Sequence, residues 1–407
     1  MSMPPPSTTP SPPPHAHPHS NPLTPSGSSS GLSSLIGLSH HGGPHSHSVP
    51  PSPDHTLGEG DEAVQATNDD ASICKRSAIQ LGYWNDPFLQ YFMRGPVIRK
   101  PPEINRGYYA RTYGVYRLIL KTLEKIATSD VVYIPKAGPG EGNRSRSNSV
   151  CETEVQIINL GCGFDTLYWR LKHDRHIREK WSKIRISSFV DVDFPTTTMK
   201  KVHNIKNTMA LLAVLNNDDG EISISKYELN AFDYHVVGID LRDVDQLGPK
   251  LQSCGIKFDL PTIFIAECVL VYMDPKASAS LLKWINDHFR TSLFLNYEQV
   301  NMTDRFAEVM LNNLNLRGCR LAGVDYCKDL TSQRQRFTDC GWQGVKAWTM
   351  NDVYASIAPK EIERIESIEM LDEHELLKQL FDHYCIVIAY NDAMTLSIDS
   401  VELKEFE

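Results

Sequence analysis

Three acidic residues, Asp193, Asp240 and Glu267, each stand at the end of a short apolar segment. A fourth apolar segment ends in the tripeptide Gly161-Cys-Gly163. If these segments are parallel strands of one sheet, their carboxyl ends lie along a single edge, where such sheets bind ligands. Carboxylates at that edge can accept hydrogen bonds from the hydroxyls of a ribose or the amine of an adenine. The spacing therefore predicts a site for an adenosine-containing ligand.

Gly161 and Gly163 would let the backbone turn sharply and approach a ligand where a Cβ would collide. For the glycines alone, a tight turn between a strand and a helix is an equally good interpretation. The third glycine of a dinucleotide fingerprint is missing, and no Gly-Lys-Ser/Thr loop is present to hold a phosphate. Because three acids would repel phosphates, the pattern favours S-adenosylmethionine over NAD or a nucleotide.

Each acid has an expected role. Asp193, at the end of the second strand, is placed to accept both ribose hydroxyls, although Asp191 offers a competing carboxylate. Asp240, after the third strand, is placed to reach the adenine amine, with Leu241 packing on the ring face. One such acid could arise by chance in an unliganded sheet, but three in order argue for a binding site.

The cofactor's own carboxylate needs a cationic partner, and the candidates are Lys75, Arg106 and Arg111. The planar guanidinium of arginine matches the geometry of a carboxylate. Both arginines lie among tyrosines, and a solvated helix face is an equally good interpretation of that pattern.

The elements that must position these residues alternate between apolar and amphipathic segments. This alternation favours an α/β fold with a doubly wound, mostly parallel sheet covered on both faces, the core of a class I methyltransferase. Strands are expected at 155–160, 186–193, 235–240, 261–267, 292–297 and 384–390. Helices are expected at 88–93, 114–126, 168–184, 196–215 and 276–289, with a polar excursion at 217–231 and a largely helical region at 302–382.

Composition divides the 407 residues into two domains. Residues 1–72 are expected to be a disordered tail rich in Pro, Ser and His, because such a segment buries little apolar surface. Residues 73–407 form the methyltransferase domain, in which 136–150 are a low-complexity insert. The histidines of the tail could bind a metal, but a solvated tail is favoured and no metal site is predicted.

Charge and cysteine content narrow the function classes. A net charge of −9 argues against a nucleic-acid partner. No apolar run is long enough for a membrane span. Nine scattered cysteines without a Cys-x-x-Cys pair or a secretion signal indicate reduced thiols inside the cell. We expect a cytoplasmic monomer, with the nucleus as a second location.

Several motifs, in order from about residue 74 to 390, resemble the leucine carboxyl methyltransferase family. They are Cys74-Lys-Arg, Gly82-Tyr-Trp-Asn-Asp-Pro, Pro102-Glu-Ile-Asn-Arg-Gly-Tyr-Tyr-Ala-Arg, Asn159-Leu-Gly-Cys-Gly-Phe-Asp-Thr, Val192-Asp-Phe-Pro, Gly238-Ile-Asp-Leu-Arg-Asp, Ile265-Ala-Glu-Cys-Val-Leu-Val-Tyr-Met, Asn296-Tyr-Glu-Gln-Val-Asn-Met-Thr-Asp-Arg-Phe, Leu321-Ala-Gly-Val and Arg364-Ile-Glu-Ser-Ile-Glu-Met-Leu-Asp-Glu. Cys162 departs from the alanine that relatives often carry, and the segment before Asp193 is longer than usual. The tail and the insert lie outside the resemblance.

The resemblance implies methyl transfer from S-adenosylmethionine to the C-terminal leucine carboxylate of the protein phosphatase 2A catalytic subunit, an ester that regulates holoenzyme assembly. The family's cofactor contacts fall on Lys75, Arg111, Gly161, Asp193, Asp240, Leu241 and Glu267. Helical insertions at 74–127 and within 300–360 are the expected lid. One alternative is the related carboxyl methyltransferase of modified transfer RNA. Another is a non-catalytic module that binds the phosphatase tail.

The expected catalytic residues are Arg111 and Tyr272. Arg111 would orient a carboxylate, either that of the cofactor or that of the substrate, and the sequence does not decide between them. Tyr272, five residues after Glu267, would lie beside the methyl donor, although a packing role is the alternative. No Ser/His or Cys/His arrangement suggests a base or a nucleophile.

Overall fold

The computed structural model describes residues 60–129, 153–174, 184–215 and 221–403. The 136–150 insert and most of the expected tail lie outside these ranges. The expected boundary at residue 72 is wrong, because helix α2 spans Asp61–Leu81. Its first half is rich in Asp, Asn, Gln and Thr and carries few apolar residues. That composition lacks the apolar periodicity by which a helix is predicted, because the inner face of this part of α2 contacts a polar cavity rather than an apolar core.

The described residues form one nine-stranded sheet in the order β3-β4-β5-β2-β1-β6-β7-β9-β8. The strands are β1 (Thr153–Leu160), β2 (Ile184–Asp193), β3 (Ser223–Ile224), β4 (Leu229–Asn230), β5 (Tyr234–Gly238), β6 (Thr262–Glu267), β7 (Thr291–Gln299), β8 (Gly344–Thr349) and β9 (Tyr384–Asp392). The central strands β5, β2, β1, β6 and β7 are parallel, whereas β9 lies antiparallel to both β7 and β8. The predicted doubly wound, mostly parallel sheet is confirmed.

The chain moves outward from β1 through β2 to β5, and then returns to place β6 on the other side of β1. The order of the strands therefore reverses between β1 and β6. Ligands of open α/β sheets bind beyond the carboxyl ends of the strands at such a reversal. The glycines after β1 and the acid at the end of β6 lie at this point.

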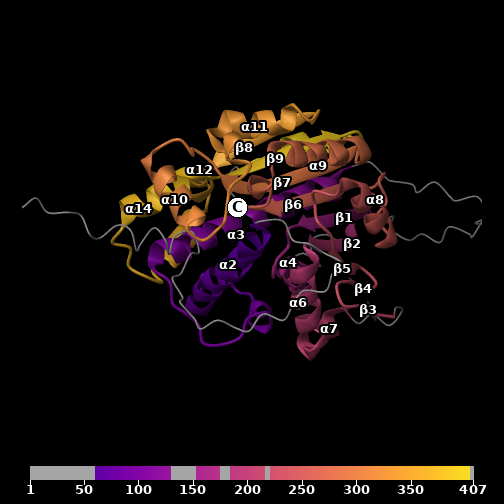
Figure 1. Ribbon diagram of the computed structural model, residues 1–407, viewed down its shortest axis with the longest axis horizontal. Helices are drawn as coiled ribbons and strands as arrows, with labels where there is room; N and C mark the ends of the chain where they lie inside the picture. The colour runs from indigo at the N-terminus through magenta and orange to yellow at the C-terminus, as the bar shows by residue number, and fades with distance from the viewer. Residues whose placement is uncertain (1–59, 130–152, 175–183, 216–220, 404–407) are drawn as a thin grey trace, which may run out of the picture.

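Helices cover both faces of the sheet (Figure 1). They are α3 (Pro102–Thr128), α4 (Leu167–His173), α6 (Pro195–Lys206), α7 (Met209–Leu215), α8 (Val244–Ser253), α9 (Pro275–His288), α10 (Arg305–Asn315), α11 (Leu330–Thr338), α12 (Met350–Ala355), α13 (Pro359–Glu366) and α14 (His374–Asp382). In the described ranges no helix combines the length and the apolar character of a membrane span, and no three potential metal ligands cluster.

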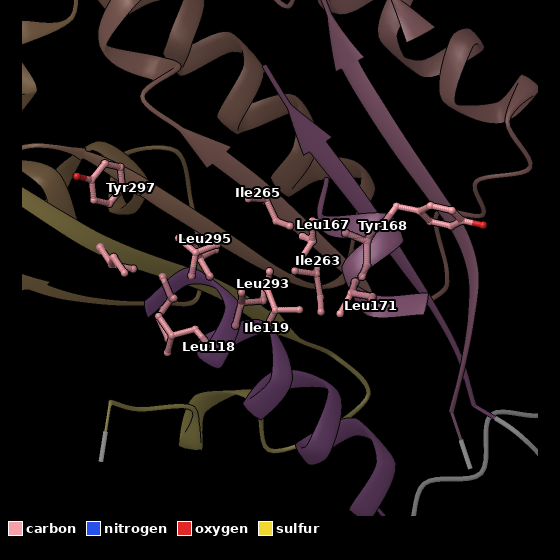
Figure 2. Packing of buried hydrophobic residues seen from close by; sticks show 14 of the residues in the cluster. Leu118, Ile119, Leu167, Tyr168, Leu171, Ile263, Ile265, Leu293, Leu295 and Tyr297 are labelled. Atoms are coloured by element: carbon pink, nitrogen blue, oxygen red, sulfur yellow. The ribbon is translucent and has the colours of Figure 1, made fainter. Parts of the chain in front are cut away.

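Alternate residues of each central strand belong to two separate apolar clusters, one on each face. Ile157 packs in the larger cluster and its neighbour Ile158 in the other. In Figure 2, Leu167 of α4 lies beside Ile263 of β6, and Leu118 of α3 belongs to the same cluster. This two-sided burial explains why the strands are continuous apolar runs in the sequence.

Several local predictions differ from the structure. Residues 88–93 contain only a 3₁₀ turn, Leu89–Tyr91, instead of an amphipathic helix. Helix α3 begins at Pro102 rather than near Gly114, because a proline is accepted at the first helical position, where no N–H partner is needed. Strand β8 interrupts the region predicted to be largely helical, and β3 and β4 form within the polar excursion.

Candidate active site

One cavity opens at the carboxyl edge of the sheet, between the strand ends and helices α2, α3 and α14. It brings together, without Arg106, the residues expected from the family's cofactor contacts and the two expected catalytic residues. These are Lys75, Arg111, Gly161, Asp193, Asp240, Leu241, Glu267 and Tyr272. They come from six separate segments of the chain, so the sheet edge gathers what the sequence spaces far apart.

The glycine turn after β1 needs both of its glycines. Gly161 and Gly163 adopt φ of 64° and 48°, a left-handed conformation that side chains disfavour. A Cβ on Gly161 would lie 2.5 Å from Cγ2 of Val269, and one on Gly163 would lie 2.2 Å from Oδ1 of Asn68. The turn is therefore tightly enclosed, and Cys162 between the glycines fits as a small buried residue.

The structure separates the two acids that competed for the ribose. Asp191 is buried away from the cavity, where it pairs with Lys201 at 2.8 Å and accepts the Tyr234 hydroxyl at 2.6 Å. Asp193 lines the cavity and accepts the Gly163 amide at 2.7 Å. Burial raises the pKa of Asp193, although the Gly163 amide partly opposes that effect. Only Asp193 is placed to meet a ligand.

Asp240 takes part in a bridge that the sequence did not predict. Arg242 donates to both oxygens of Asp240 at 2.6–3.0 Å, and its two amino groups also donate to Asp61, in the first turn of α2, at 2.7 and 3.1 Å. The Arg242 guanidinium thus links Asp240, which follows β5, to helix α2, which lines the cavity. Leu241, which lies between Asp240 and Arg242 in the sequence, is largely buried and lines the same cavity.

Helix α2 forms one wall of the cavity. Its cavity-lining residues recur at helical spacing; they are Asp61, Val64, Gln65, Thr67, Asn68, Ala71, Ser72 and Lys75. Side chains three and four residues apart share one helix face. Asn68 also accepts the backbone amide of Phe164 in the glycine turn at 2.8 Å. The N-terminal helix is therefore part of the site rather than of the tail.

Arg111 and Glu267 form the central ion pair. The Nε atom of Arg111 donates to Oε2 of Glu267 at 2.5 Å, and the guanidinium lies 4.6 Å from the ring centre of Tyr297. Burial disfavours ionisation of Glu267, but Lys75 and Arg111 together hold the pKa of its carboxyl below the usual value. Both members of the pair are therefore charged at neutral pH.

The other two candidate cations have different surroundings. Lys75 lines the cavity and pairs with Asp165 at 3.2 Å. Burial opposes ionisation of Asp165, but Lys75 and other cations hold its pKa below the usual range. Arg106 is buried outside the cavity and donates to the carbonyl of Glu369 at 2.8 Å. The prediction that Arg106 approaches the ligand is wrong, because its position on α3 turns it toward the segment before α14.

Comparisons with known proteins agree with this site. The family model described as leucine carboxyl methyltransferase matches residues 145–286. Leucine carboxyl methyltransferase 1 of Rattus norvegicus is 40% identical over 84% of this chain and 93% of its own, and that of Bos taurus is 41% identical over the same shares. The chain belongs to the leucine carboxyl methyltransferase family. It is therefore an S-adenosylmethionine-dependent carboxyl methyltransferase.

A second type of relative is more distant. The tRNA wybutosine-synthesizing protein 4 of Homo sapiens is 32% identical over 80% of this chain but only 44% of its own length. The identity to the leucine carboxyl methyltransferases is higher, and these relatives match over nearly their whole length. The resemblance found in the motifs is thereby confirmed at the level of the family.

The cavity of this family member suits S-adenosylmethionine. Its acids line the strand ends, and a Cβ on either glycine would collide with the cavity wall. Asp193 and Asp240 would hold the ribose and the adenine, and Lys75 or Arg111 the methionine carboxylate. Because the cofactor carries a sulfonium and an ammonium but no phosphate, a carboxylate-rich cavity matches its charge.

Tyr272 is held in place by a buried ion pair that sequence reasoning missed. It ends the 3₁₀ turn Leu270–Tyr272, whose Val271 amide donates to Glu298 at 2.5 Å. Glu298 in turn pairs with Arg336 of α11, and both side chains are almost fully buried. The signal was present in the family motif beginning at Asn296, but no spacing rule links Glu298 to a residue on α11.

Proposed function

We propose that this chain transfers the methyl group of S-adenosylmethionine to the C-terminal leucine carboxylate of the protein phosphatase 2A catalytic subunit. The observation that carries the proposal is that one cavity is lined by two kinds of side chain. Carboxylates and glycines of the strand ends form the cofactor part. Arginine and apolar side chains of α3, α12 and α14 form a second part, which suits a terminal leucine.

The apolar wall fits an aliphatic side chain. It consists of Ile104, Tyr108, Met350, Leu380 and Phe381, which come from helices far apart in the sequence. Burying a leucine side chain against such a wall contributes roughly 1.5–3 kcal/mol. A polar or charged terminal residue would lose its hydration there without gaining partners.

Arg111 of α3 lines the cavity and contacts residues of two strands, β6 and β7. Its guanidinium pairs with Glu267 on one side and lies over the ring of Tyr297 on the other. The Arg111 side chain is only 12% exposed, so a carboxylate that contacts it is largely withdrawn from water. In this position the guanidinium can hold a carboxylate next to the methyl donor.

The reaction needs no general base from the protein. An α-carboxylate has a pKa of about 3.3–3.7, so the substrate is already an ionised nucleophile at neutral pH. Burial raises the pKa of Tyr272 and of Tyr297 well above the usual value, so both hydroxyls stay protonated and can donate to the carboxylate. These side chains orient the nucleophile and do not take its proton.

Orientation and exclusion of water are the protein's main contributions. S-Adenosylmethionine, when bound, supplies an electrophilic methyl group on a positively charged sulfur. The cavity walls remove water from the incoming carboxylate, and Arg111 and Tyr272 fix its direction. Holding two reactants in line can supply roughly 7–11 kcal/mol of a barrier in favourable systems. Dehydration further strengthens the attraction between the carboxylate and the cationic donor.

The alternatives fit the observations less well. A transfer RNA substrate would meet a protein of net charge −9, and the relative of that type matches over less than half of its own length. A non-catalytic binding module would not need the acids and glycines that line the cofactor part. We also propose that the protein acts as a monomer in the cytoplasm and, as a second location, in the nucleus, which cell fractionation would test.

The test uses the full chain, purified phosphatase catalytic subunit and S-adenosylmethionine labelled in the methyl group. We expect label in the phosphatase as a base-labile ester, and none when the terminal leucine is deleted. Label on transfer RNA instead, or cofactor binding without transfer to any acceptor, would contradict the proposal.

A further inference from the structure

Lys201, on helix α6, is a buried cation one contact away from the cofactor cavity. Its side chain is fully buried and lies outside the cavity. The Nζ atom lies 2.8 Å from Oδ2 of Asp191 and donates to the backbone carbonyl of Asp165 at 2.9 Å. Burial alone would lower the pKa of this amine, but Asp191 raises that pKa above the ordinary value. Lys201 is therefore a cation that joins a buried acid to a residue of the cavity wall.

Asp165 is the cavity residue that Lys201 holds. It lines the cavity, and its Oδ1 atom accepts the backbone amide of Leu167 at 2.7 Å. Its Oδ2 atom pairs with Lys75 at 3.2 Å. Lys75 is one of the two residues expected to hold the methionine carboxylate of the cofactor. The position of the Asp165 backbone therefore sets the position of the carboxylate against which Lys75 rests.

The glycine turn of the cofactor site runs into Asp165. The Asp165 amide donates to the Cys162 carbonyl at 2.9 Å and closes the turn. Within the turn the Gly163 amide donates to Asp193, the acid expected to hold the ribose, at 2.7 Å. A hydrogen bond that fixes the Asp165 carbonyl thus also restrains the turn that meets Asp193. Lys201 reaches two expected cofactor contacts through this one bond.

The buried acid that pairs with Lys201 is itself fixed on strand β2. Asp191 accepts the Tyr234 hydroxyl at 2.6 Å and the Asn159 amide at 3.2 Å. Taking two charges out of water can cost more than their attraction returns, so a buried ion pair is a poor source of stability. A fixed acid does, however, direct the Lys201 amine toward the Asp165 carbonyl. Placement of the turn therefore explains the pair better than stability does.

We propose that Lys201 is a positioning residue for cofactor binding. Through its hydrogen bond to the Asp165 carbonyl it holds the glycine turn, and the carboxylate that Lys75 contacts, in the conformation that binds S-adenosylmethionine. A site that is already ordered binds more tightly, because binding does not have to order it. The inference rests on the cofactor site and not on the identity of the methyl acceptor.

Two variants separate this role from a contribution to folding. Asp191→Asn leaves Lys201 without its buried partner charge, but the amine keeps N–H groups for the Asp165 carbonyl. It should lower the urea-unfolding midpoint, yet bind S-adenosylhomocysteine within about twofold of wild type by calorimetry. Adding Lys201→Met removes both the unpaired amine and the donor. The double variant should be more stable than Asp191→Asn but bind S-adenosylhomocysteine about fivefold to tenfold more weakly than wild type.

Kinetics and a matched control complete the test. In the double variant the KM for S-adenosylmethionine should rise by the same factor, while kcat at saturating cofactor stays close to that of wild type. Asp233→Asn breaks another acid–lysine pair, with Lys172, and lies outside the cavity. This control should keep the wild-type affinity for S-adenosylhomocysteine.

Two results would overturn the inference. One is an Asp191→Asn enzyme that loses affinity about fivefold or more, as a purely structural pair predicts; it can be measured even if the double variant fails to fold. The other is a folded double variant that binds S-adenosylhomocysteine like wild type. Failure of the proposed function is distinguishable, because calorimetry needs no methyl acceptor and the affinities stand whichever acceptor the enzyme uses.

Discussion

Replacing Arg111 with glutamine removes one charge from the ion pair at the centre of the site. The Nε atom of Arg111 lies 2.5 Å from Glu267, and the two side chains are 12% and 15% exposed. Glutamine keeps a hydrogen-bond donor of similar reach but leaves the Glu267 carboxylate with Lys75 as its main cationic neighbour. The change therefore isolates the charge of the guanidinium.

The expected loss of kcat/KM follows from the burial of the Arg111–Glu267 pair. Breaking a buried pair by removing one partner costs about 3–5 kcal/mol. Because Lys75 still faces Glu267, we expect a cost below that range, about 2–3 kcal/mol. That corresponds to a fall of roughly 30- to 150-fold in kcat/KM for the phosphatase subunit. Arg111→Lys keeps the charge but loses the planar fork, so we expect an intermediate activity.

The same substitution should change the stability of the protein in acid. In wild type the pKa of Glu267 is held below its usual value, so its contribution is present above the unfolded-state pKa of about 4.3 and is lost as pH falls through the lower folded-state pKa. Without Arg111, burial is less opposed and the pKa rises. Loss of stability should then begin at a higher pH in Arg111→Gln, as urea-unfolding midpoints between about pH 4 and pH 7 would show.

The kinetic assay follows labelled methyl transfer at saturating cofactor, and circular dichroism checks that each variant is folded. An Arg111→Gln enzyme with unchanged kcat/KM, and with the wild-type loss of stability at low pH, would refute the role given to the ion pair. Full activity in Arg111→Lys, with strong loss in Arg111→Gln, would instead show that a point charge is enough and that the fork geometry is unimportant.

Four further substitutions test other parts of the site. Asp193→Ala and Asp240→Ala should each weaken S-adenosylhomocysteine binding about tenfold or more by calorimetry, because each removes acceptors for the nucleoside; unchanged affinity in both would reject the assignment of the cofactor part. Gly161→Ala should lower the thermal midpoint and cofactor affinity together, because its Cβ would lie 2.5 Å from Val269; a midpoint equal to that of wild type would contradict the enclosed turn. Arg242→Gln should expose the start of α2 to limited proteolysis, and cleavage as slow as in wild type would argue against the bridge.

Sequence reasoning succeeded where the signal lies within one segment. Apolar runs that end in glycine or in acid identified the central strands, and the parallel arrangement then placed Gly161, Asp193 and Glu267 at one edge. Of the two candidate acids after β2, the structure brings only Asp193 to the cavity. These features could be predicted because each depends on local pattern and on one general rule of sheet topology.

What was missed depends on contacts between distant segments. The Arg242 bridge to Asp61 and the Glu298–Arg336 pair join residues far apart in sequence, and no periodicity reveals them. Helix α2 was missed because a helix that faces a polar cavity lacks an apolar stripe. Strand β8 was assigned to a helical region because β9, with which it pairs, follows much later in the chain.

The central claim is methylation of a terminal leucine carboxylate, and one measurement tests it most directly. The full chain is incubated with phosphatase 2A catalytic subunit and labelled S-adenosylmethionine, and the C-terminal peptide is analysed by mass spectrometry. We expect a mass increase of one methyl group on the terminal carboxylate, lost after mild base, and a much smaller yield with Arg111→Gln over the same time. A methyl group on any other residue, or none on the phosphatase, would contradict it.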